Sequence, residues 1–121
     1  MPKVPATLRL KGKLATGEVW VNGKPLSLKK SLEVYSHSPT GFSWGYGGSG
    51  PAQLALAILL RYLPEIDAVS LHQDFKWKFI APLPQEDFET QLDIREWIAE
   101  ASRPDAVRED DPVSSLPVNR L

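Results

Sequence analysis

Hydrophobic and polar residues alternate in the first part of the chain, which is the pattern of a half-buried β-strand. In residues 7–11 (TLRLK), the leucines fall on one face and the basic residues on the other. Residues 18–21 also alternate and are followed by Asn22-Gly23, a dipeptide typical of a two-residue hairpin turn. Because Pro25 has no amide hydrogen, we expect the returning strand to be short or to lie at an edge of the sheet.

The same reasoning predicts a second hairpin and one further strand. Residues 31–46 contain a turn-forming SPTG segment at 38–41, followed by aromatic residues at alternate positions, as in a hairpin. Residues 74–80 (DFKWKFI) alternate between charged and aromatic residues up to a final isoleucine. This alternation predicts a strand with its aromatic side chains on one face.

Two segments have the patterns of helices. Residues 52–63 are apolar on nearly all sides, as in a helix buried all round, and Pro51 suits a first helical turn. Thr90 and Asp93 resemble a capping box, and apolar residues then recur at helical spacing up to residue 101. The order of elements predicts an α+β fold, with an antiparallel sheet of about four or five strands and two helices packed on one face.

We place a single α+β domain at residues 1–103 and a disordered C-terminal tail at residues 104–121. The tail contains three prolines and several charges without hydrophobic periodicity, a composition that does not support a packed core. The longest apolar run, residues 54–60, is far shorter than the ~20 residues of a membrane span. The start of the chain has no apolar stretch of signal-peptide length. We therefore expect a cytoplasmic protein with no membrane contact.

The net charge of −1 is unevenly distributed, because residues 1–30 carry seven basic side chains and one acidic side chain. Arg9, Lys11 and Lys13, together with Trp20, form a candidate surface for a protein partner or a polyanion. A solvated edge hairpin that lysine keeps soluble is the plain alternative. Nucleic acid is the less favoured partner, since the whole chain is not basic.

The chain has no cysteine and only two histidines. This excludes disulfides, thiol catalysis and metal sites built from cysteine. No ligand spacing singles out a metal site, so we predict neither a metal nor a cofactor.

The segment Gly45-Tyr46-Gly47-Gly48-Ser49-Gly50 matches the pattern G-x-G-x-x-G between a predicted strand and a predicted helix. Glycines let the backbone approach an anion, and the amides at a helix start carry partial positive charge. The ligand would be a small anion, most plausibly a nucleotide. Ser49 would donate to phosphate, His37 or Lys76 would supply charge, and Trp44 or Tyr46 would stack a base.

Three observations argue against a true dinucleotide-binding domain. The preceding strand is predicted to be antiparallel, the chain is too short for two mononucleotide-binding halves, and Pro51 lacks an amide hydrogen. The structural alternative is a tight crossing at which the glycines admit Trp44 and Tyr46 close to the helix.

Enzymatic function is less favoured than binding, and we assign no catalytic residue. Ser49 would need a base as a nucleophile, and His37 and His72 are the only histidines. One hypothesis gathers the two histidines with Asp74 and Lys76 around the glycine segment. The alternative has both histidines bonded to nearby carbonyls.

Residues 35–57, which contain GFSWGYGGSGPAQLALA, resemble the signature of a family of small uncharacterised proteins from bacteria, plasmids and phages. Residues 73–76 and a closing helix with Trp97 are also similar, so the resemblance spans about residues 17–100. The family is a domain of unknown function and implies no catalytic residues. Its occurrence on mobile elements implies either small-ligand binding or interference with a host defence complex, as anti-CRISPR proteins do. We therefore expect a non-enzymatic ligand-binding module, with a protein-interaction module as the alternative and the oligomeric state left open.

Overall fold

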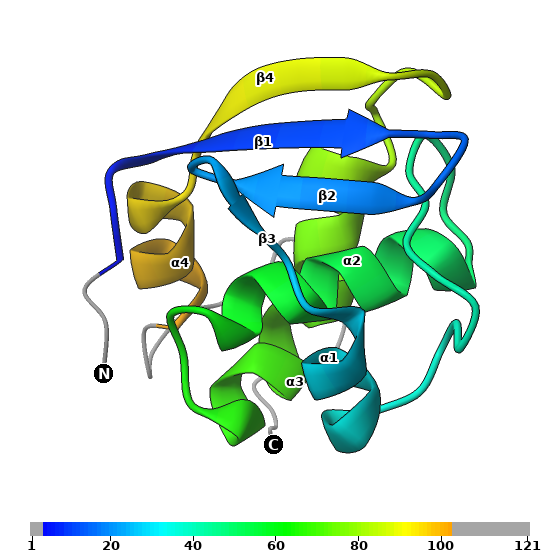
Figure 1. The fold of residues 1–121 in the computed structure, drawn as a ribbon. Coiled ribbons are helices and arrows are strands. Elements are labelled where there is room, and N and C mark those ends of the chain that lie inside the picture. Colours follow the sequence, from blue (N-terminus) through cyan, green and yellow to red (C-terminus); the bar gives the residue numbers. More distant parts are fainter. Residues whose placement is uncertain (1–3, 103–121) are drawn as a thin grey trace.

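A four-stranded antiparallel sheet forms one layer of the molecule, with the strands in the order β3-β2-β1-β4 (Figure 1). The structure is a computed structural model that describes residues 4–102. The strands are β1 (Thr7–Lys13), β2 (Glu18–Val21), β3 (Lys24–Pro25) and β4 (Phe88–Asp93). The helices are α1 (Leu28–Val34), α2 (Ser49–Leu60), α3 (Glu65–Phe75), the π-helix η1 (Lys76–Ile80) that continues α3, and α4 (Arg95–Ala101). They pack on one face of the sheet, which confirms the predicted α+β fold with two more α-helices than expected.

The strands β1 and β2 and the hairpin turn at Asn22-Gly23 follow the predicted pattern. Asn22 and Gly23 both have positive φ, 51° and 82°, as the two central residues of a type I′ turn require. The side chain of Asn22 fixes the turn further, because its Oδ1 accepts from the backbone N–H of Arg9 at 2.8 Å. The returning strand β3 has two residues, ends at Pro25 and lies at the edge of the sheet, as expected.

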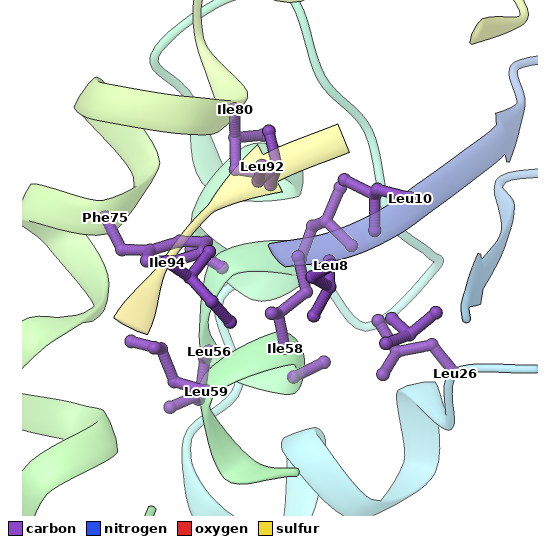
Figure 2. Packing of buried hydrophobic residues seen from close by; sticks show 14 of the residues in the cluster. Leu8, Leu10, Leu26, Leu56, Ile58, Leu59, Phe75, Ile80, Leu92 and Ile94 are labelled. Atoms are coloured by element: carbon purple, nitrogen blue, oxygen red, sulfur yellow. The ribbon is translucent and has the colours of Figure 1, made fainter. Parts of the chain in front are cut away.

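The core lies between the inner face of the sheet and α2. Leu8 and Leu10 of β1 point from the sheet toward α2, and side chains of α3, η1 and β4 complete the cluster (Figure 2). Every residue of α2 from Gly50 to Leu59 is buried. The prediction of a helix surrounded on all sides is therefore confirmed, although α2 begins three residues earlier than expected.

The predicted hairpin at residues 31–46 is wrong, since this region contains α1 and a long loop. Ser27 begins α1 by accepting from the N–H of Lys30 at 3.2 Å, a cap that satisfies a helix-start amide. Ser31 is fully buried in α1 although it is polar. Because this polar residue occupies the inner face, the apolar pattern of the helix is masked in the sequence.

The predicted strand at residues 74–80 is also wrong, because α3 and η1 pass through it without a break. The buried positions from 68 to 76 recur at steps of three and one, and the next buried position, 80, follows after four residues, as on one face of a helix. Two of them, His72 and Lys76, are polar. Because these two polar residues hide the helical pattern, the aromatic residues at 75, 77 and 79 stand out in the sequence, and their alternation resembles that of a strand. Trp77, expected on the apolar face, is 60% exposed.

The predicted capping box at Thr90 and Asp93 is wrong, because both residues belong to β4. Phe88, Thr90 and Leu92 face inward, and β4 pairs antiparallel with β1. The last helix instead starts at Arg95. Its predicted apolar stripe does face the core.

Among residues 4–102, no helix has the length and hydrophobicity needed to cross a membrane. The tail predicted at residues 104–121 lies outside the part of the chain that the structure describes.

Candidate functional site

The glycine segment connects the long loop to the start of α2, and two aromatic rings lie on its backbone. A Cβ at Gly47 would come within 2.1 Å of the indole of Trp77, and one at Gly48 within 2.5 Å of the ring of Tyr46. These glycines therefore make room for aromatic rings, as predicted for Tyr46 by the hypothesis of a tight crossing next to the helix. That alternative named Trp44 as the second ring, and the structure has Trp77 in its place.

Trp44 is fully buried, so its ring has no free face on which a base could stack. Its indole N–H donates to the carbonyl of Glu86 at 2.9 Å. The ring packs edge-to-face on Phe88, with 5.0 Å between ring centroids. A Cβ at Gly12 would come within 2.7 Å of the same indole, so Gly12 makes room for it. Tyr46, in contrast, is 43% exposed.

Lys76 lies against the glycine segment, as the sequence predicted, but its contacts are with the protein itself. The side chain is only 6% exposed. Its ammonium donates to the carbonyl oxygen of Gly47 at 2.9 Å and lies 4.3 Å from the ring centroid of Trp77. The hydrogen bond and the cation–π contact hold the glycine segment onto η1.

Gln53, which sequence reasoning missed, fixes the loop before the glycine segment. It is fully buried in α2. Its Oε1 accepts from the N–H groups of His37 and Ser38 at 2.6 and 3.0 Å. Its Nε2 donates to Ser31 Oγ at 2.9 Å and to the carbonyl of Tyr35 at 3.0 Å. All four hydrogen-bonding positions of the amide are used, and the signal in the sequence was one polar residue within an apolar helix.

His37 and His72 meet beside α2, with 2.9 Å between their Nε2 atoms. His72 Nδ1 lies 2.6 Å from the carbonyl oxygen of Val69. Because a carbonyl only accepts, Nδ1 carries a proton, and in the neutral ring Nε2 has the lone pair. His37 Nε2 is then the donor between the two rings. The ring of Tyr35 stacks on His37 at 4.4 Å between centroids.

The pKa values of both histidines are lowered from 6.5. Burial is the largest cause for His37, followed by the charges of His72 and Lys76. Burial is also the largest cause for His72, partly opposed by its hydrogen bond to Val69. Both rings are therefore neutral at neutral pH. The two histidines lie together and feel the charge of Lys76, but of the three only Lys76 has a contact with the glycine segment. His72 also bonds a carbonyl, so each hypothesis describes part of the arrangement.

A polar hollow of about 430 Å³ opens at the start of α2, on the loop that carries Tyr46. Neither His37 nor Lys76 lines it. Its hydroxyl-bearing residues are Thr16, Ser38, Thr40, Ser43, Tyr46 and Ser49. Gly48 is the N-cap of α2 without a side-chain cap, and the first turn of the helix has no acidic residue. Ser49 is exposed at the first position of the helix.

The second candidate surface is the outer face of the sheet. Arg9, Lys11 and Lys13 are exposed there along β1, and Lys11 lies 5.8 Å over the half-buried ring of Trp20. In the adjacent strand, Glu89 is directly opposite Lys11. The outer face therefore carries charges of both signs, which the sequence could not show before the strand order was known.

The described residues contain no group of three or more histidine, cysteine, aspartate or glutamate side chains placed to hold a metal ion. Asp74, which the sequence placed in the polar cluster, follows His72 by two positions in α3.

A family model, the family of unknown function DUF6166, matches residues 10–100 of the chain. The chain belongs to this family. The match begins within β1 and covers the rest of the sheet, the glycine segment and nearly all of α4, so each candidate site of this DUF6166 domain lies largely within it. No curated protein and no solved structure shows a significant match to the chain.

Proposed function

We propose that the DUF6166 domain is a non-enzymatic module that binds a small anionic ligand at the start of α2. The observation that supports the proposal is the hydroxyl-lined hollow at this helix end. The hydroxyls of Thr16 and Ser38 donate to Glu18 and to the carbonyl of Gly41, and the remaining four can donate to an oxyanion.

The position of α2 favours an anion at this end of the helix. The helix has twelve residues and is buried along most of its length, so solvent screens its dipole less than that of a surface helix. Its cap, Gly48, has no side chain that would satisfy the first amides. A ligand oxyanion would take that place.

The lining also limits the ligand class. No residue that lines the hollow is charged, so the ligand would be held by dipoles and hydrogen bonds rather than by ion pairs. This favours one compact phosphate or sulfate group over a polyphosphate. Tyr46 is exposed beside the hollow and would stack a planar part of the ligand, such as a nucleobase.

The test uses Ser49→Asp, which places a negative charge at the helix start. This charge favours the helix through its dipole and repels an anion in the hollow. We expect phosphate, sulfate and nucleoside monophosphate binding, measured by calorimetry, to weaken at least tenfold while thermal stability is kept. Ser70→Asp is the matched control, since Ser70 is exposed on α3. Equal affinity in the two variants contradicts the proposal, as does an absence of binding to the wild type.

The open face of the sheet supports a second candidate function. The half-buried Trp20 and the cations of β1 form a patch there that would anchor a protein partner. The partner would be a host protein complex, such as a defence complex inhibited by a mobile element. In a pull-down from host lysate, Lys11→Glu with Lys13→Glu should lose the partner, whereas Ser49→Asp should retain it.

A further inference from the structure

The histidine pair is a second candidate site, separate from the hollow at the start of α2. The chain has two histidines and no cysteine. Although 35 positions separate them in the sequence, their Nε2 atoms lie 2.9 Å apart. Every imidazole in the chain therefore meets at one point.

Each histidine is held by contacts that do not use its Nε2 atom. The backbone of His37 is fixed by Gln53, and its ring by stacking on Tyr35. The ring of His72 is fixed by the hydrogen bond from Nδ1 to the Val69 carbonyl. His72 is therefore oriented as histidines that ligate metals are, with the second ring nitrogen donating to a carbonyl.

We propose that His37 and His72 bind one divalent transition-metal ion through their two Nε2 atoms. Metal–imidazole bonds of about 2.05 Å, at about 90° to each other, place the two nitrogens about 2.9 Å apart. The observed separation of 2.9 Å, at which the rings share a hydrogen bond, is compatible with both nitrogens on one ion. A right angle between imidazole ligands suits the tetragonal geometry of Cu²⁺ and Ni²⁺.

Binding requires one rearrangement of protons. The proton between the rings moves from Nε2 to Nδ1 of His37, which leaves both Nε2 lone pairs facing the ion and releases no proton. His72 keeps its proton on Nδ1. The side-chain amide of Gln73 lies 3.5 Å from His72 Nε2, and its oxygen is available as a third ligand after rotation of the amide. Water would complete the coordination of the ion from the side of His37, which is the more exposed of the two rings.

Lys76 sets the strength of this site. Its charge lowers the pKa of both histidines, and it repels a metal cation for the same reason. The site is therefore weaker than a bis-histidine site without a neighbouring cation. Replacing Lys76 with methionine, which is similar in length and uncharged, should tighten metal binding.

The test is calorimetric titration of the full, untagged chain with Ni²⁺ after removal of metals by a chelator. We expect one ion per chain, and at least tenfold weaker binding to His37→Gln and to His72→Gln. Lys76→Met should bind at least threefold tighter. The spectrum of the Cu²⁺ form should show two equivalent imidazole nitrogens by electron paramagnetic resonance.

The variants also separate this site from the proposed anion site. If the buried His72→Gln variant does not fold, His37→Gln and Lys76→Met still decide the question, because they change the affinity in opposite directions. Ser49→Asp should leave Ni²⁺ binding unchanged. The proposal is wrong if the wild type shows no saturable binding, or if His37→Gln binds as tightly as the wild type.

Discussion

At the scale of single residues, one missing Cβ has different consequences in different places. Gly12 faces the indole of Trp44 and the ring of Phe88 within the core, whereas Gly47 faces the exposed ring of Trp77. A buried ring has nowhere to move, because protein interiors are close-packed. An exposed ring can swing into solvent.

The first prediction compares the same substitution at these two glycines. Gly12→Ala should lower the free energy of unfolding by about 1–3 kcal/mol through overpacking. Gly47→Ala should cost clearly less, because the Trp77 ring can move, and should change the tryptophan fluorescence of the folded protein. Urea denaturation of both variants tests this. Equal losses of stability would show that the Trp77 ring is as fixed as the core.

The second prediction concerns pH. The folded pKa values of His37 and His72 lie below 6.5, so the unfolded chain takes up protons first as pH falls. The stabilisation is complete above about pH 6.5 and is lost as pH falls toward the folded pKa values. The urea midpoint, measured with a chelator between pH 7.5 and 5.5, should therefore decrease. Replacing both histidines with glutamine should flatten this decrease, and an unchanged slope contradicts the assignment.

At the scale of elements, the success of sequence analysis depended on which side chains face the core. Strands β1 and β2, the turn at Asn22-Gly23 and α2 could be predicted because their inward positions are apolar and the turn residues have specific backbone requirements. α1, α3 and η1 could not, because Ser31, His72 and Lys76 occupy inward positions and interrupt the helical pattern. Strand β4 was missed because the inward Thr90 was interpreted as a helix cap.

The candidate site shows the same division. The glycine segment and the proximity of Lys76 were predictable from glycine spacing and charge. The role of Gln53 was not, because three of its four partners lie in a loop whose path the sequence does not reveal. The fourth partner, Ser31, lies in α1, which the sequence analysis did not predict. Nor could alternation show that η1 turns Trp77 outward, since a π-helix adds a residue to each turn.

The third prediction tests Gln53 as the link between α2 and the loop. Gln53→Met keeps the volume but leaves the N–H groups of His37 and Ser38 without their acceptor. The cost should be about 2 kcal/mol or more, because buried donors lose their partner. Hydrogen exchange should rise in the loop at residues 35–48. Gln91→Met, on the exposed face of β4, is the control and should change stability by less than about 0.5 kcal/mol.

At the scale of the whole molecule, the helices cover one face of the sheet and leave the other face open (Figure 1). The basic residues concentrated in the first thirty positions lie partly on this open face. Strand β4 brings Glu89 and Asp93 beside them from a distant part of the sequence. The uneven charge along the chain therefore becomes a mixed surface in the folded protein.

The fourth prediction follows from this mixed surface. Binding to nucleic acid relies on a continuous basic surface that releases counterions. We expect no measurable affinity for duplex DNA or RNA at 150 mM salt in fluorescence anisotropy. Glu89→Lys with Asp93→Lys should create such binding, with a strong salt dependence. Tight, salt-sensitive binding of the wild type would show that the acidic strand does not offset the basic one.

The contact of Trp44 with Gly12 and Phe88 also has a kinetic consequence. It joins three segments separated by at least thirty positions in the sequence. Closing such long loops costs chain entropy before any packing is gained. We therefore expect the indole of Trp44 to leave water late in folding, when the first and last strands are already paired. The fluorescence of this tryptophan would then follow the final step by which the chain reaches its native state.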